Sequence, residues 1–219
     1  MEALDIRYYF VKAHSVISQG LLGEIYAFRG EFFHSSYLSA EKPFSWRLDF
    51  EKSGGGALAD LGVHMIDLAR FILGEFESVS AKVKTIVKKR KSPDGNVVDV
   101  TVDDWALIFV KLESGAHGTI EASKTAVGKG GTHLEIYAQR GALLIDLDNP
   151  YDLKAFDVDS KRIYFDEDLL SKDAFYKMVM GVYPNPKFSQ GYMVDAHAVS
   201  LSLFHEIDNR PSCERAFNF

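Results

Sequence analysis

The sequence predicts an α+β fold in which helices cover one face of an open, largely antiparallel sheet. Segments with alternating apolar and polar residues follow one another from residue 76 to residue 165, with turn residues between them. Residues 53–73 have the apolar period of a helix. The segment 105–112 is apolar on both of its faces, and the few predicted helices supply one covering layer. We therefore expect the other face to be an oligomer interface with a second copy of the chain.

The order of elements along the chain follows from the same patterns. A short helix is expected at 11–18, where Gln19 and Gly20 end it, and a strand at 24–34. Residues 35–52 have no clear period and are expected to form a loop. The remaining strands are expected at 76–88, 105–112, 116–124, 134–138, 142–147, 153–158 and 161–165, with a turn at 91–96 and a last helix at 191–209.

Composition restricts the class of protein. The 219 residues, 47% of them hydrophobic, suit one domain that spans 1–219. A net charge of −6 without an arginine-rich face argues against a nucleic-acid partner. No apolar run approaches the roughly 18 residues of a membrane span, so we expect no membrane contact and a cytoplasmic protein. The single cysteine, Cys213, forms no disulfide framework and no metal cluster.

Three glycines, Gly54 to Gly56, precede the predicted helix at 53–73, which we expect to be mostly buried. Asp60 and His64 share its polar strip, because residues four apart are neighbours on a helix surface. Two interpretations remain open. Asp60 satisfies the helix start and His64 packs in the core, or the two form a pair in a cleft, where a carboxylate orients an imidazole that accepts a proton.

The run from Ser45 to Ala81, SWRLDFEKSGGGALADLGVHMIDLARFILGEFESVSA, resembles the C-terminal substrate-binding domain of the glucose-fructose oxidoreductase and inositol dehydrogenase (Gfo/Idh/MocA) family. The motif of that family is three glycines followed by Asp-x-Gly-x-His, matched here by Asp60, Gly62 and His64. The resemblance begins near LLGEIYAFRG, continues through GTIEASK and EIYAQRGALLIDL, and covers most of the chain.

The resemblance implies an NAD- or NADP-dependent oxidoreductase that acts on a sugar, inositol or related polyol and forms a homodimer or tetramer. The family's dinucleotide-binding domain has no counterpart in this sequence, so we expect an isolated or truncated substrate domain that binds no cofactor and is inactive alone. Gly54, Gly56 and Ala59 fit the pattern G-x-G-x-x-A, but no buried strand precedes them. Glu41-Lys42-Pro43 matches the family's cofactor-domain tripeptide, and we interpret it here as coincidental.

The resemblance also implies residue roles. His64 would be the general base and Asp60 its partner. Trp46 and Arg47 match a Trp-Arg pair that the family places before its glycines, and Lys124 takes a position that often holds arginine there. Trp46, Arg47 and Lys124 would contact the substrate.

Alternatives stay open for several of these residues. Arg47 is suited to a hydroxyl-rich or anionic substrate through its forked donors, and equally suited to pairing with Asp49 or Glu51. His133 follows a glycine-rich loop and is a candidate ligand contact. We assign no residue to a metal or a cofactor. The alternative to an enzyme domain is a module that binds ligand or forms oligomers without redox chemistry.

Overall fold

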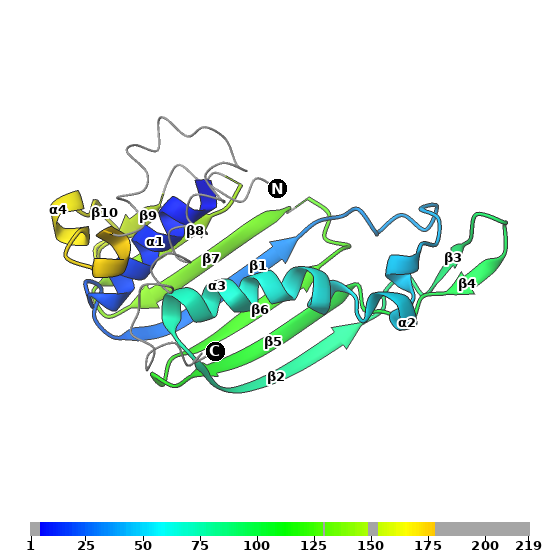
Figure 1. Ribbon diagram of the computed structural model, residues 1–219, viewed down its shortest axis with the longest axis horizontal. Coiled ribbons are helices and arrows are strands. Elements are labelled where there is room, and N and C mark those ends of the chain that lie inside the picture. Colours follow the sequence, from blue (N-terminus) through cyan, green and yellow to red (C-terminus); the bar gives the residue numbers. More distant parts are fainter. Residues whose placement is uncertain (1–4, 129, 149–152, 178–219) are drawn as a thin grey trace, which may run out of the picture.

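A computed structural model describes residues 5–128, 130–148 and 153–177. It contains an eight-stranded open sheet in the order β10-β9-β8-β7-β1-β6-β5-β2 (Figure 1). Only the neighbours β1 and β6 are parallel; all other neighbouring strands in this sheet are antiparallel. The α+β class with a largely antiparallel sheet is thus confirmed. The strands of the sheet are β1 (Ile25–Phe33), β2 (Phe76–Lys84), β5 (Trp105–Leu112), β6 (His117–Ser123), β7 (Gly131–Ala138), β8 (Gly141–Asp146), β9 (Lys154–Phe156) and β10 (Arg162–Ile163).

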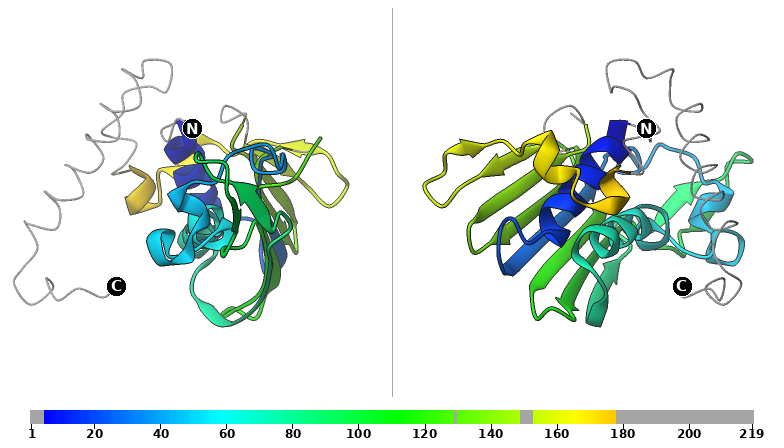
Figure 2. Two further views of the ribbon diagram at one scale, coloured as in Figure 1. Left: turned by 90° about the vertical axis from the view of Figure 1, so that its right-hand side faces the viewer. Right: turned by 60° about the vertical axis from the view of Figure 1, so that its left-hand side comes forward.

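Two longer helices, α1 (Asp5–Ser18) and α3 (Val63–Leu73), lie on the same face of the sheet (Figures 1 and 2). The rings of His14 in α1 and Phe71 in α3 stack with centroids 4.9 Å apart. The short helix α4 (Glu167–Leu170) joins this layer, where the hydroxyl of Ser15 donates to the carbonyl of Leu170 at 3.3 Å. The helix predicted at 191–209 lies outside the described residues. In the described part of the chain, no helix combines the length and apolarity that crossing a membrane requires.

The core lies between these helices and the inner face of the sheet. Along β5 the even-numbered residues, from Ala106 to Leu112, are at most 5% exposed, whereas Phe109 on the opposite face is 50% exposed. A side chain at Gly30 in β1 would meet the methyl group of Met65, so this glycine lets α3 approach the sheet closely. One face of β5 is therefore covered by helices and the other is open.

A smaller apolar cluster lies at one end of the sheet. Leu48, Val100 and Val102 are buried there, and Tyr37 and Phe44 pack against them. The 3₁₀ turn η1 (Trp46–Leu48) contributes Leu48 to this cluster. Figure 1 shows the short helix α2 (Phe50–Ser53) near the hairpin of β3 (Lys89–Lys91) and β4 (Val97–Asp99). The region 35–52 therefore contains two short helical segments besides loop.

The guanidinium of Arg90 fastens the preceding loop to this hairpin. Arg90 is 3% exposed and donates to the carbonyls of Ser39 at 2.6 Å and Lys42 at 3.0 Å, and also to that of Tyr37. The strand predicted at 76–88 ends earlier, at Lys84. The carboxylate of Asp104 accepts the N–H groups of Ile86 and Val87, at 2.7 and 2.9 Å. These groups therefore do not continue the hydrogen-bonded pairing of β2 with β5.

Candidate functional site

The helix that follows the three glycines begins with a π-helical turn, η2 (Leu58–Gly62), and continues as α3. Asp103 anchors this beginning. Its carboxylate accepts the N–H groups of Gly56 at 3.1 Å and Leu58 at 2.8 Å, and its carbonyl accepts that of Ala57 at 2.9 Å. A wider π turn is common at functional sites, and here it carries Asp60.

Gly56 has no room for a side chain. A Cβ atom at this position would overlap the backbone of Asp103, which cannot move away as the end of a flexible side chain can. The close approach of the two backbones is what lets Asp103 reach three successive N–H groups of the helix start. The glycine run is therefore used for packing against the loop before β5.

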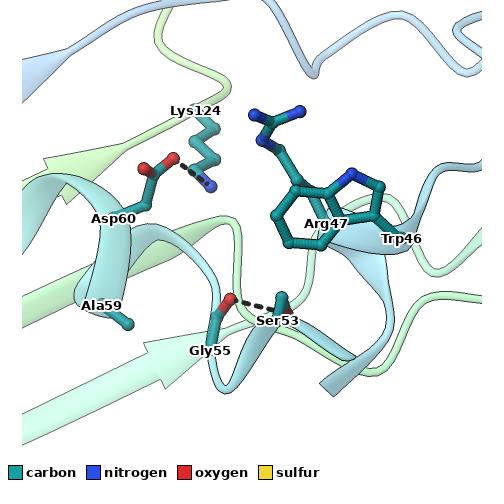
Figure 3. A pocket seen from close by; sticks show the side chains of 7 residues that line it. All are labelled: Trp46, Arg47, Ser53, Gly55, Ala59, Asp60 and Lys124. Atoms are coloured by element: carbon teal, nitrogen blue, oxygen red, sulfur yellow. Dashed lines mark hydrogen bonds and ion pairs between the residues drawn. The ribbon is translucent and has the colours of Figure 1, made fainter. Parts of the chain in front are cut away.

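A pocket of about 120 Å³ that opens to solvent lies beside the π turn (Figure 3). The carboxylate of Asp60 and the ammonium of Lys124 form an ion pair there, with Oδ2 and Nζ 2.8 Å apart. The Arg47 guanidinium lies over the Trp46 ring, 4.6 Å from its centroid. Figure 3 shows the two pairs on facing sides of the pocket. The lining residues are Trp46, Arg47, Ser53, Gly55, Ala59, Asp60 and Lys124.

Further positive charge surrounds the ring of Tyr37. The ammonium groups of Lys42 and Lys124 lie 3.6 and 5.3 Å from its centroid, and the guanidinium carbon of Arg90 lies 5.8 Å from it. Burial lowers the pKa of Lys42, and the positive charges of Arg90, Lys124 and Arg47 lower it further. Apolar periodicity in the sequence could not place Lys42 beside Lys124 and Arg90, because the loop that carries Lys42 meets these distant segments only in the folded chain.

His34, at the end of β1, is a second residue near the site that the sequence does not indicate. Its Nδ1 accepts the backbone N–H of Ser36 at 3.3 Å. Burial lowers the pKa of His34, the charge of Lys124 lowers it further, and the carboxylate of Asp60 partly opposes this. The neutral imidazole is thus favoured beside the ion pair.

Four of the six predicted site residues come together: Trp46, Arg47, Asp60 and Lys124. Arg47 does not pair with its acidic neighbours in the chain. The carboxylate of Asp49 instead binds Lys52 at 3.1 Å and accepts the N–H of Glu51 at 3.2 Å. The structure shows no ion pair of Arg47 with Asp49 or Glu51, and the Arg47 side chain lines the pocket.

The predicted pairing of Asp60 with His64 is not present among the described contacts. Asp60 binds Lys124, and the exposed ring of His64 has Phe32 as its neighbour, with centroids 6.3 Å apart. The expectation of a mostly buried helix is also wrong, because Asp60 is 58% and Val63 46% exposed. Only the stripe that faces the sheet is buried. The opposite face of the helix has no covering element within the described residues.

His133 lies apart from the pocket. It belongs to β7, and its Nδ1 is 3.5 Å from Oδ1 of Asp146 in the neighbouring strand β8. Polar atoms of His133, Asp146 and Asp148 lie within 4.8 Å of one another, in a partly exposed position that lines no part of the pocket. The proposed ligand contact of His133 therefore has no support from this geometry.

The open antiparallel sheet with one helical layer is a fold of dehydrogenases. Residues 10–144 match the model of the GFO/IDH/MocA C-terminal domain. The chain belongs to this family, and the matched segment includes every residue that lines the pocket.

Curated relatives and solved structures agree with the family. Levoglucosan dehydrogenase from Pseudarthrobacter phenanthrenivorans is 26% identical over 84% of this chain and 52% of its own length. Myo-inositol 2-dehydrogenase from Thermotoga maritima is 27% identical over 63% of this chain and 37% of its own length. The structure of a levoglucosan dehydrogenase in complex with NADH and levoglucosan superimposes with a TM-score of 0.73 and 25% identity, over 93% of this chain and 56% of that one. The chain thus spans about half the length of levoglucosan dehydrogenase.

Proposed function

We propose that this chain is the substrate-binding part of an NAD- or NADP-dependent oxidoreductase that acts on a sugar, inositol or related polyol. The observation that carries the proposal is the pocket at the π turn, in which an ion pair faces an aromatic ring covered by a guanidinium. The named activities of the relatives, on levoglucosan and myo-inositol, support this substrate class.

The lining groups match the chemistry of a polyol. Hydroxyl groups both donate and accept hydrogen bonds, and the pocket offers a carboxylate acceptor on Asp60 with ammonium and guanidinium donors on Lys124 and Arg47. Trp46 is 53% exposed and presents an apolar surface beside these groups. A polyol bound here would therefore be oriented by charged hydrogen bonds on one side and by ring contact on the other.

The glycine run does not fit a dinucleotide. The N–H groups of Gly56 and Leu58, which a phosphate cradle would need free, are already bound to the carboxylate of Asp103. We therefore place the nucleotide outside the residues that this chain contributes. In the complete enzyme, NAD or NADP would take up the hydride as the alcohol is oxidised to a carbonyl.

His64 is the group proposed to accept the proton of the substrate hydroxyl. It is exposed and lies on the helix that carries Asp60, one turn beyond the pocket. The proposed role of Asp60, together with Lys124, is to position the hydroxyl. In the complete enzyme, His64→Ala should lower kcat while binding persists, and an unaffected rate would refute the assignment.

Intrinsic fluorescence tests the binding function directly, because Trp46 lines the pocket and the chain has only two tryptophans. In a Trp105→Phe background, titration with myo-inositol or levoglucosan should give a saturable change in emission. Asp60→Asn should weaken it, whereas Trp46→Phe should abolish the signal. If the emission shows no saturable change up to about 0.1 M ligand, any binding is weaker than an enzyme can use, and the proposal is refuted.

The open sheet face is proposed to bind a second copy of the chain. Phe109 is 50% and Tyr137 43% exposed on strands whose other faces are buried. An oligomeric module without redox chemistry would use the same surface. Light scattering at micromolar concentration should give a dimer or tetramer mass, and a monomer mass would refute the interface.

A further inference from the structure

The charged residues that line the pocket are Arg47 and Lys124, which are positive, and Asp60, which is negative. Four cationic residues gather here: Lys42, Arg47 and Lys124 together with Arg90. Only Lys124 has a carboxylate partner, Asp60; within residues 5–128, 130–148 and 153–177, none of the other three forms an ion pair. The chain as a whole has a net charge of −6, so this local excess is opposite in sign to the protein.

We propose that the substrate of this pocket carries an anionic group, a phosphate or a carboxylate, beside its hydroxyl groups. This inference rests on the proposed function and narrows its substrate class. The anionic group would bind the guanidinium of Arg47, and the hydroxyl groups would bind Asp60 and Lys124.

Arg47 is prepared for such a contact. Its guanidinium is exposed, has no carboxylate partner among the described residues, and is held against the face of Trp46 at 4.6 Å from the ring centroid. Because no carboxylate of the described residues occupies it, the planar fork of Arg47 is available to form two parallel hydrogen bonds with a phosphate or a carboxylate.

Lys42 and Arg90 add to the field without needing to touch the ligand. Arg90 is 3% exposed and committed to backbone carbonyls, so its charge is permanent and weakly screened. The ammonium of Lys42 lies 3.6 Å from the centroid of the Tyr37 ring; burial lowers its pKa, and repulsion by the charges of Arg90, Lys124 and Arg47 lowers it further. A bound anion would relieve this repulsion, whereas a neutral polyol would not.

Matched ligands test the charge preference. The indole N–H signal of Trp46 in ¹H–¹⁵N spectra would be followed at constant ionic strength with D-glucose, D-glucuronate, D-glucose 6-phosphate and inorganic phosphate. We expect one or both sugar anions to bind about tenfold or more tightly than glucose, the size of one charged hydrogen bond. The two sugar anions distinguish a carboxylate from a phosphate. Weaker binding of inorganic phosphate alone would show that the hydroxyl groups are also recognised.

Substitutions test which side chains produce the preference for the sugar anion. Arg47→Gln should reduce the preference for the sugar anion, measured as the ratio of its affinity to that of glucose, at least about fivefold. Lys42→Gln should reduce this ratio less, and mainly at low salt. Lys161→Gln removes an equal charge on a distant turn and should change nothing.

The experiment distinguishes failure of the anion inference from failure of the proposed function. Equal affinity for glucose and both anions would overturn the inference and leave the proposed function standing. No binding of any of these sugars or of a neutral polyol would overturn both. A preference that survives Arg47→Gln and Lys42→Gln together would also overturn the inference.

Discussion

The carboxylate of Asp60 and the ammonium of Lys124 lie 2.8 Å apart, yet their surroundings differ. The side chain of Lys124 is 4% exposed, whereas that of Asp60 is 58% exposed. The lysine is therefore the partner that depends on the pair, because a buried ammonium without a counter-charge is costly. The π turn places the carboxylate of Asp60 beside Lys124, so the geometry of the helix start determines whether the buried ammonium is neutralised.

Asp60→Asn should destabilise the fold, because it leaves the buried Lys124 without a carboxylate. We expect the free energy of unfolding to fall by about 1 kcal/mol, a value discounted for the exposure of Asp60. Urea unfolding followed by circular dichroism measures this change. Asp67→Asn on the same helix is the control, since Asp67 is exposed and should change stability by less than about 0.5 kcal/mol. Equal effects of the two substitutions would contradict the assignment.

Gly56→Ala should be more harmful than Gly54→Ala. The new methyl group at Gly56 would overlap the backbone of Asp103, which costs about 3 kcal/mol or prevents folding. Gly54 has φ +75° and open space around it, so alanine there adds only backbone strain of about 1–2 kcal/mol. Urea unfolding of the two variants gives the comparison, and soluble yield decides it if one does not fold. A smaller loss for Gly56→Ala would show that the helix start is not packed as described.

His34 should titrate below its ordinary pKa of 6.5, because burial and Lys124 lower it. NMR titration of the imidazole checks this. Lys124→Gln should raise the pKa of His34, since a repelling charge is removed, whereas Asp60→Asn should lower it further, since an attracting charge is removed. Shifts in the same direction for both variants would contradict the arrangement of the three groups.

The lowered pKa of His34 makes the stability of the fold depend on pH. Because the folded pKa of His34 lies below 6.5, the unfolded chain binds more protons as the pH falls through 6.5. The His34 contribution to stability is therefore fully present above pH 6.5, declines as the pH falls toward the folded pKa, and is constant below it. The difference in urea midpoint between the wild-type chain and His34→Gln should change in that pH window only.

NADH and NADPH should not bind this chain by itself. The N–H groups at the glycine run are occupied by Asp103, so no free phosphate cradle remains there. Titration of the chain into each nucleotide, followed by nicotinamide fluorescence, should show no saturable change up to about millimolar concentration. Micromolar binding would place the nucleotide on this chain and overturn the division of roles proposed above.

Local periodicity was sufficient to predict the elements that frame the site. The segment 105–112 was correctly predicted as a strand, but both of its faces are apolar, so its period did not predict which face the helices cover. The apolar stripe that includes Leu61, Met65 and Leu68 predicted the face of the helix that packs on the sheet. An apolar period of 2 in a strand, or of 3.6 in a helix, marks the residues that face the core. The same patterns overestimated burial on the second face of the helix, because a moderately apolar face also tolerates exposure.

The spacing Asp-x-Gly-x-His did not predict which partner Asp60 has. An ideal α-helix would bring residues four apart together, but the π turn at Leu58–Gly62 changes the angular relation between Asp60 and His64. That turn is set by Asp103, which precedes β5 and is distant in sequence. A long-range hydrogen bond of this kind has no local signature.

Within the described residues, the sequence by itself determined the approximate positions of the strands of the large sheet and of the two longer helices. It also gave the family resemblance and the candidates Trp46, Arg47, Asp60 and Lys124. Only the tertiary structure decided that these four surround one pocket and that His133 lies elsewhere. It also decided that Lys42 and Arg90 contribute charge beside it. The physical reason is that local periodicity follows from contact with the core, whereas the charge around a pocket depends on which distant loops the fold brings together.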